Sequence, residues 1–175
     1  GSEEQRERYA MRFLRTDLLA CQLFSEPGAG SDLASLRTRA VADGDDWVVN
    51  GQKVWTSGAK YADFGLLLAR TDPEQPKHTG ITAFLLPLDS PGVEVRPIRQ
   101  MSGGASFSEV FLSDVRISVA RRIGAIGQGW KVATATLAFE RTASGSSTRR
   151  KGGTVSDLVE LATRRGANSD PVVRQ

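Results

Sequence analysis

The 175-residue sequence predicts an α+β fold in which an antiparallel, barrel-like β-domain lies between helical segments. Three observations predict it. Apolar residues recur at helical spacing only near the two ends, short segments with a period of two or with continuous apolar character fill the middle, and turn-rich linkers separate those segments. Strands that follow one another without crossover helices favour an antiparallel barrel or sandwich over a parallel sheet.

A helix is expected from Glu3 to Ala20. Tyr9, Phe13 and Leu14 recur at helical spacing among charged residues, and the segment contains no Gly or Pro. At Cys21 the pattern changes to short, strand-like segments. The helix therefore precedes the β-domain.

The strands of the β-domain are read from alternation and apolar runs. Asp43-Gly44-Asp45 turns the chain between the first two runs. The Asn50-Gly51 pair predicts a second hairpin, because both central residues of a type I′ turn need positive φ. The predicted strands cover residues 36–41, 47–49, 52–55, 64–69, 81–86, 93–97 and 109–115.

Two helices are expected after the β-domain. The period becomes helical from Trp130 to about Arg150, and a second helix, capped by Thr154 or Ser156, runs to Arg165 before Gly166. The helical segments at the two ends are too short to enclose cores of their own. The chain therefore has the organisation of the middle of a larger protein.

Composition argues against several classes of protein. With 39% hydrophobic and 25% charged residues the chain fits a soluble globular protein. No run approaches the roughly 20 apolar residues of a membrane span, and the first residues lack a signal-peptide centre, so a cytoplasmic location is expected. One cysteine, Cys21, cannot form an internal disulfide, and with one histidine, His78, no metal site is expected.

The basic balance is weak evidence for a nucleic-acid partner, and we expect none. The formal net charge is +3, but the cations are not interleaved with aromatic residues. Their densest run, Arg149-Arg150-Lys151, lies near the end of a predicted helix, where the helix dipole favours solvated cations. Contact between this run and the phosphates of a small ligand is the alternative.

The segment FSEPGAGSD, residues 24–32, predicts a shaped loop, because it is too rich in Gly, Pro and short polar residues for a helix or a strand. Gly28 and Gly30 are expected to take positive φ and to let the backbone approach a ligand, while Ser25 and Ser31 add hydroxyl groups. An anion or the polar edge of a cofactor fits such a loop. A tight surface turn is the alternative.

The segment Trp55-Thr56-Ser57-Gly58 ends the second strand of the predicted hairpin. A tryptophan at a strand end can stack on a planar ring while a neighbouring hydroxyl group bonds to one of the ring nitrogens. The alternative is a core tryptophan followed by a turn.

Glu140 and Arg141 share a broad helical face with Trp130, Ala133 and Leu137. Charges on such a face lie at its rim or are buried with partners, because burial of an unpaired charge is costly. A carboxylate in an apolar pocket can act as a general base, so Glu140 is a candidate base. An interhelical ion pair is the alternative.

Six blocks of the chain, in order, resemble the acyl-CoA dehydrogenase family. They are GSEEQRERY, CQLFSEPGAGSD, DGDDWVVNGQKVWTSGA, GITAFLLPLDSPGVEV, EVFLSDVRI and GQGWKVATATLAFER. The resemblance implies an N-terminal helical domain, a middle β-barrel-like domain and a C-terminal four-helix domain. Residues 1–20 would end the first, residues 21–128 would form the second, and residues 129–175 would be the first helices of a truncated C-terminal helical bundle.

The resemblance also implies an activity. The family oxidises an acyl-CoA thioester to the trans-2-enoyl-CoA: FAD takes the β-hydrogen as hydride at N5, a carboxylate removes the α-proton, and an electron-transfer flavoprotein accepts the electrons. Ser31 would contact both FAD and the acyl-CoA, and Arg141 would lie close to the CoA substrate. The other residues that would bind FAD are Gln22, Phe24, Ser25, Trp55 and Ser57.

Glu140 would be the base if this protein follows the isovaleryl-CoA and long-chain branches, which place a Glu just before that Arg. Most members take the base from a later helix that this chain lacks. The family forms homo- or hetero-oligomers, usually tetramers, and completes the FAD site with C-terminal helices and a neighbouring subunit. Residues 1–175 alone are therefore expected to bind FAD weakly and to lack turnover.

Two other functions fit the same resemblance. Acyl-CoA oxidases and flavin monooxygenases share the loop architecture but react with oxygen. A non-catalytic flavin-binding or partner-binding subunit of a heteromeric dehydrogenase is the alternative outside the enzymes.

Overall fold

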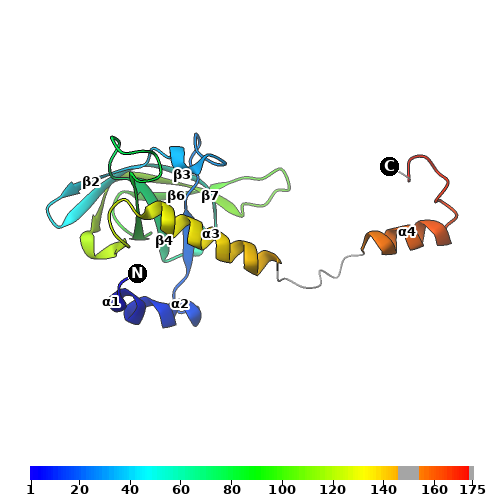
Figure 1. The fold of residues 1–175 in the computed structure, drawn as a ribbon, viewed down its shortest axis with the longest axis horizontal. Helices are drawn as coiled ribbons and strands as arrows, with labels where there is room; N and C mark the ends of the chain where they lie inside the picture. Colours follow the sequence, from blue (N-terminus) through cyan, green and yellow to red (C-terminus); the bar gives the residue numbers. More distant parts are fainter. Residues whose placement is uncertain (146–153, 174–175) are drawn as a thin grey trace. The chain divides into compact units, whose positions relative to one another are not determined.

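The computed structural model describes residues 1–145 and 154–173, and for residues 143–145 it describes the backbone alone. The chain divides into two compact units, Gly1–Leu137 and Ala138–Gln175. The first unit carries the N-terminal helices and the sheet, and the second carries α4 (Figure 1).

The N-terminal helical stretch is shorter than the sequence predicts. It consists of α1 (Glu3–Gln5), a π-helical segment (Arg6–Ala10) and α2 (Met11–Leu14). Thr16 takes a left-handed φ of 59°, and the N–H groups of Asp17 and Leu18 both donate to the Arg12 carbonyl, which closes the helix. The prediction of a helix to Ala20 is therefore wrong: Leu18 is buried and Ala20 begins a strand.

The first unit is built on one eight-stranded, mostly antiparallel sheet (Figure 1). The strands run in the order β6-β7-β3-β2-β4-β5-β8, and β1 pairs with β4. Their bounds are β1 Ala20–Leu23, β2 Arg39–Asp43, β3 Asp46–Ser57, β4 Phe64–Arg70, β5 Ile81–Pro87, β6 Val93–Ile98, β7 Phe107–Ser118 and β8 Arg122–Ile123. Short 3₁₀ turns lie at η2 Leu33–Ser35, η3 Ala59–Tyr61 and η4 Val119–Arg121.

The predicted α+β class is confirmed, but the sheet is not wholly antiparallel. β4 runs parallel to β1, and it meets β2 in parallel at the single pair Arg39–Arg70. The other pairings are antiparallel. β1 pairs with a strand about forty residues later, and a period-two pattern carries no information about such a partner.

Asn50-Gly51 does not form the predicted hairpin turn. β3 runs through both residues, and its register with β7 shifts there. Asn50 and Asp114 exchange two hydrogen bonds of 2.9 Å, and Asp114 holds a left-handed φ of 50°, so the irregularity is a β-bulge. A Cβ on Gly51 would come within 2.4 Å of Thr38 Oγ1. The predicted turn around Gly44 does join β2 to β3, with a φ of 60° at the glycine.

Apolar side chains are buried on both faces of the sheet. Leu67 and Leu68, neighbours on β4, belong to different core clusters because successive side chains of a strand point to opposite faces. The cluster around Leu68 includes Phe24, Leu33 and Ala133, so loop residues and the start of α3 (Gly129–Gly145) cover this face. The FSEPGAGSD loop is therefore a packed part of the unit.

The start of α3 lies very close to β5. A Cβ on Gly129 would lie 2.7 Å from the carbonyl carbon of Thr82, so only glycine permits this approach. Thr82 is fully buried, and its Oγ1 accepts from the Gly127 N–H at 3.0 Å. These contacts attach the beginning of α3 to the sheet.

The second unit contains α4, Val155–Arg164. Thr154, one of the two predicted caps, is the N-cap, and its side chain forms a capping box with Asp157. Gly166 follows with a left-handed φ of 64°. The basic run Arg149-Arg150-Lys151 lies outside the described residues.

In the part of the chain that the structure describes, no helix is long and apolar enough to cross a membrane. The expected cytoplasmic location stays a prediction.

Candidate functional site

The loop 24–32 contains a tight turn closed by backbone hydrogen bonds. The Glu26 N–H donates to the Ala29 carbonyl at 2.8 Å, and the Ala29 N–H donates to the Glu26 carbonyl at 3.0 Å. Neither Gly28 nor Gly30 has positive φ, so that prediction is wrong. A Cβ at either glycine would meet no atom within 4 Å. The glycines leave open space beside exposed backbone rather than relieve backbone strain.

The buried Glu26 side chain joins three parts of the chain. Its Oε2 accepts from the Arg37 N–H at 2.6 Å, and its Oε1 accepts from the Thr38 N–H at 2.9 Å and from Lys53 Nζ at 2.8 Å. The same Nζ donates to the Phe24 carbonyl at 3.0 Å. Glu26 thus connects the start of the loop, the chain that leaves it, and β3.

Burial and pairing act in opposite directions on these two groups. Burial lowers the pKa of Lys53 to about 8, against the raising effect of Glu26. Burial by itself would raise the pKa of Glu26, but the Lys53 charge and the hydrogen bonds outweigh it and hold this pKa below its usual value of 4.5. The Glu26 carboxylate is therefore ionised at neutral pH.

The last residues of β3 present Trp55 and Ser57 to solvent. The register with β7 shifts between Lys53 and Thr56, and Trp55 takes a left-handed φ of 58°. The Trp55 side chain is 60% exposed, and its ring meets Phe107 edge-on at a centroid distance of 6.1 Å. The alternative of a core tryptophan is therefore wrong. Ser57 is exposed as well, two residues further along the strand.

The loop and the irregular end of β3 lie side by side. The Val54 N–H donates to the Ser25 carbonyl at 2.9 Å, directly before Trp55. Ser25 is half-buried, whereas the Phe24 side chain is buried in the core. Phe24 can therefore offer a ligand only its backbone.

The structure brings some of the predicted residues together. Phe24 and Ser25 are held against the strand that carries Trp55 and Ser57. Gln22 on β1 and Ser31 at the far end of the loop are exposed.

Glu140 and Arg141 belong to the second unit, where both side chains are exposed. Their proposed roles as base and CoA contact stay predictions.

A planar ring with a polar edge fits the arrangement in the first unit. Trp55 supplies an exposed aromatic face, the space at Gly28 and Gly30 is open, and Ser25 and Ser57 supply hydroxyl groups. In addition, Thr56 Oγ1 is buried without a hydrogen-bond partner among the residues that the structure describes.

Sequence reasoning missed Lys53 and Glu26. The available signal was the alternation of β3: Trp47 and Val49 face the core, and the same parity carries Lys53 inward. A lysine at a core position requires a buried partner. Nothing in the local sequence indicates that the partner is Glu26.

No group of three or more His, Cys, Asp and Glu side chains gathers at a possible metal site within residues 1–145 and 154–173.

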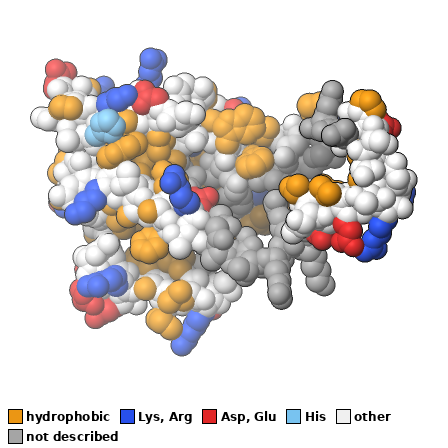
Figure 2. All heavy atoms as spheres, turned by 45° about the vertical axis from the view of Figure 1, so that its right-hand side comes forward, with side chains coloured by type: hydrophobic (Ala, Val, Ile, Leu, Met, Phe, Trp, Pro, Cys, Tyr) orange, Lys and Arg blue, Asp and Glu red, His pale blue; other side chains and the backbone are white. Residues whose placement is uncertain are grey.

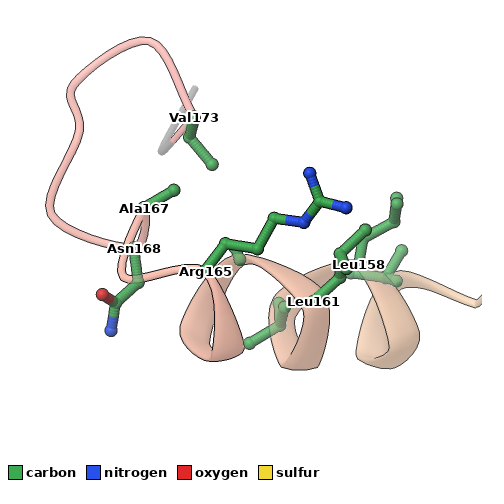
Figure 3. A pocket seen from close by; sticks show the side chains of 9 residues that line it. Leu158, Leu161, Arg165, Ala167, Asn168 and Val173 are labelled. Atoms are coloured by element: carbon green, nitrogen blue, oxygen red, sulfur yellow. The ribbon is translucent and has the colours of Figure 1, made fainter.

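The second unit has an apolar hollow of its own. Figure 3 shows it between α4 and the segment that follows, with Leu158, Leu161, Arg165, Ala167 and Val173 among its lining residues. Hydrophobic side chains are also visible at the surface in Figure 2, and those exposed on α4 include Leu158 and Leu161. None of the predicted site residues lines the hollow.

Comparison with known proteins gives a family match. The family model described as "Acyl-CoA dehydrogenase, middle domain" matches residues 21–115. Among curated proteins of Mycobacterium tuberculosis, the chain is 48% identical to "Acyl-CoA dehydrogenase IpdE1" over its whole length and 46% of the relative. It is 52% identical to "Acyl-CoA dehydrogenase FadE34" over 85% of the chain and 21% of the relative. The chain thus spans less than half the length of these relatives.

Solved structures give the same result. The "Tcur3481-Tcur3483 steroid ACAD" is 41% identical, with a TM-score of 0.81 over 99% of this chain and 45% of that one. A glutaryl-CoA dehydrogenase from Mycobacterium smegmatis in complex with FADH2 is 36% identical, with a TM-score of 0.62 over 70% of this chain and 31% of that one.

Proposed function

The chain belongs to the acyl-CoA dehydrogenase family, and from that premise we propose that the protein oxidises an acyl-CoA thioester to the trans-2-enoyl-CoA with FAD as its cofactor. In this proposal residues 1–20 end an N-terminal helical domain, residues 21–128 form the middle domain, and residues 129–175 begin a C-terminal helical domain. The FADH2 complex of a related glutaryl-CoA dehydrogenase supports the choice of cofactor.

One observation carries the proposal for the flavin site. Trp55 exposes most of a large apolar ring from a backbone in the left-handed region, beside a loop held at Ser25. Exposure of a large tryptophan ring to water is unfavourable. A left-handed backbone is also unfavourable at any residue other than glycine. A ring stacked on Trp55 would offset these costs.

FAD held at this site would supply the acceptor for the β-hydrogen of the substrate, which leaves as hydride. Phe24 would hold it through the backbone, Ser25 and Ser57 through hydroxyl groups, and Trp55 by covering the ring. Hydrogen-bond donors fixed beside the ring stabilise negative charge there without reorganisation. Gln22 would add a contact from β1.

The substrate contacts come from other residues in this proposal. Ser31, exposed at the end of the loop, would contact both FAD and the acyl-CoA. Glu140 would remove the α-proton, and Arg141 would lie close to the CoA. A base from a later helix of the family's C-terminal domain is the alternative.

Trp55→Ala in the intact protein tests the flavin site. Loss of the stacking surface is expected to weaken FAD binding about tenfold, which corresponds to about 1.4 kcal/mol. The measurement is quenching of flavin fluorescence on titration, with the exposed Tyr61→Ala as control. Equal FAD affinity in the Trp55 variant and the native protein would remove Trp55 from the site.

Reduction of the bound flavin by CoA thioesters under nitrogen tests the reaction. The proposal expects loss of the visible flavin absorption with substrate and slow reoxidation in air, whereas rapid peroxide release identifies an oxidase. Undiminished turnover in Glu140→Gln removes that residue from the role of base.

The identity of the substrate and partners follows the relatives in this proposal. The similarity to a structure named as a steroid ACAD favours an acyl group attached to a steroid ring, which a comparison of steroidal and straight-chain CoA esters tests. The name of that structure joins two proteins, which favours a hetero-oligomer for this protein as well. In such an assembly this chain could instead belong to a non-catalytic subunit, and this is the second candidate function. An electron-transfer flavoprotein is the proposed acceptor and the cytoplasm the proposed compartment.

A further inference from the structure

We infer that the buried Lys53–Glu26 ion pair positions the flavin-facing backbone of the loop 24–32 against the end of β3. The inference rests on the proposed function for the identity of the ligand. Lys53 and Glu26 act in it as positioning residues, through Phe24, Ser25 and Trp55.

Three consecutive loop residues are held by two consecutive strand residues. Lys53 Nζ donates to the Phe24 carbonyl and to the Glu26 carboxylate, and between them the Val54 N–H donates to the Ser25 carbonyl. A segment held at three consecutive residues has little freedom to shift. Since misplacement by about 1 Å can cost a site much of its effect, such fixation matters for ligand contacts on either side.

The ion pair supplies directional hydrogen bonds to the loop, which an apolar pair of the same volume cannot form. Apolar side chains often replace a buried ion pair without loss of stability, so stability alone gives no reason for a lysine with no exposed surface. Lys53 Nζ reaches two acceptors on the loop, and the Glu26 carboxylate also accepts from the backbone of Arg37 and Thr38. The directions of these bonds specify where the loop begins and where the chain leaves it.

The register of β3 supports the same conclusion. Pairing with β7 is interrupted between Lys53 and Thr56, which is where Val54 pairs with the loop instead. The same interruption contains Trp55 with its left-handed φ. The strand segment that holds the loop is therefore continuous with the segment that exposes the proposed stacking surface.

The chain offers a matched control on the same loop. Lys77 Nζ lies 2.8 Å from Asp32 Oδ1, the same distance as in the buried pair, but both side chains are at least half exposed. Lys77→Met removes an ammonium group that contacts this loop without touching residues 24–26.

The test compares Lys53→Met, the double variant Lys53→Met with Glu26→Gln, and Lys77→Met in the intact protein. Fluorescence titration measures the affinity for FAD, and the visible circular dichroism of bound FAD reports the surroundings of its ring. Amide hydrogen exchange at Val54, measured without FAD, reports how firmly the Val54 N–H stays bonded to the loop. Urea unfolding gives stability separately. The double variant leaves no unpaired buried charge, so it is expected to be more stable than Lys53→Met.

The expected result is that both Lys53 variants bind FAD about tenfold or more weakly, change its visible circular dichroism and exchange faster at Val54, while Lys77→Met stays within about twofold of the native affinity. A double variant that folds and retains native affinity, dichroism and exchange overturns the inference. A double variant that does not fold also overturns it, because the pair is then a requirement of folding.

The two proposals fail in different ways. If the native intact protein does not bind FAD, the proposed function fails, and hydrogen exchange at Val54 by itself decides whether the pair positions the loop. If the native protein binds FAD and the Lys53 variants do so equally well, the positioning inference alone fails.

Discussion

Two lysine–carboxylate pairs contact the two ends of one loop at the same distance, and they differ in burial and in their other hydrogen bonds. Lys53 and Glu26 join the start of the loop to β3, while Lys77 and Asp32 join its far end to the segment before β5. Both pairs have a nearest N···O distance of 2.8 Å. The side chains of the first pair are 0% and 7% exposed, and those of the second are 50% and 60% exposed.

The comparison shows that two ion pairs with the same N···O distance need not contribute equally to stability. In the buried pair, neither charge can be solvated if the other is removed, so each depends on its partner. In the exposed pair, water replaces a lost partner at once. Only the buried pair can therefore dictate backbone geometry.

The largest expected effect is that of Lys53→Met on stability. The substitution leaves the Glu26 carboxylate buried without its counter-ion, and loss of one partner of a buried pair costs about 3–5 kcal/mol. Urea unfolding of the intact protein measures it. A change below about 1 kcal/mol would mean that water reaches Glu26 and would remove the distinction between the two pairs.

Acid is expected to act on the buried pair in a defined pH window. The pKa of Glu26 in the folded chain lies below the usual 4.5, so its ionised form stabilises the fold above that pH. As pH falls below 4.5 the unfolded chain binds the proton first, and this stabilisation is lost as pH passes the lower folded pKa.

The free energies of unfolding of the native protein and of Glu26→Gln should therefore converge as pH falls through that window. Denaturant titrations at several pH values test this. A difference that stays constant from neutral pH to well below 4.5 would contradict the lowered pKa.

High salt is expected to weaken the coupling energies of the two ion pairs to different extents, which is a smaller effect than those above. At about 1 M salt the screening length is about 3 Å, so the coupling between exposed Lys77 and Asp32 should vanish, while that between Lys53 and Glu26 should persist. Double-mutant cycles with Lys77→Met and Asp32→Asn, and with Lys53→Met and Glu26→Gln, measure both couplings. Equal salt sensitivity of the two couplings would contradict the difference in burial.

The smallest expected effect is that of Lys77→Met. Its urea midpoint should be indistinguishable from that of the native protein, because exposed pairs rarely contribute measurably. A clear fall in the midpoint would show that the far end of the loop is also held by its ion pair.

Local signals predicted the elements whose ends are decided locally. Thr154 and Gly166 bound α4 through a capping box and a left-handed residue, and the turn at Gly44 follows from its own residues. Prediction failed where distant residues decide. Asn50-Gly51 has the composition of a turn, but Asn50 pairs with Asp114 and the segment continues β3, where a side chain at position 51 would clash with Thr38.

In the candidate site, too, some features follow from the local sequence and others depend on contacts between distant segments. The sequence by itself determined the α+β class, the loop at residues 24–32 and its residue types, because these depend on composition and short-range pattern. Only the tertiary structure decided that Trp55 is exposed, that Gly28 and Gly30 are not strained, and that Lys53 is paired with Glu26. Burial and pairing depend on which distant segments meet, and a strand pattern leaves that choice open.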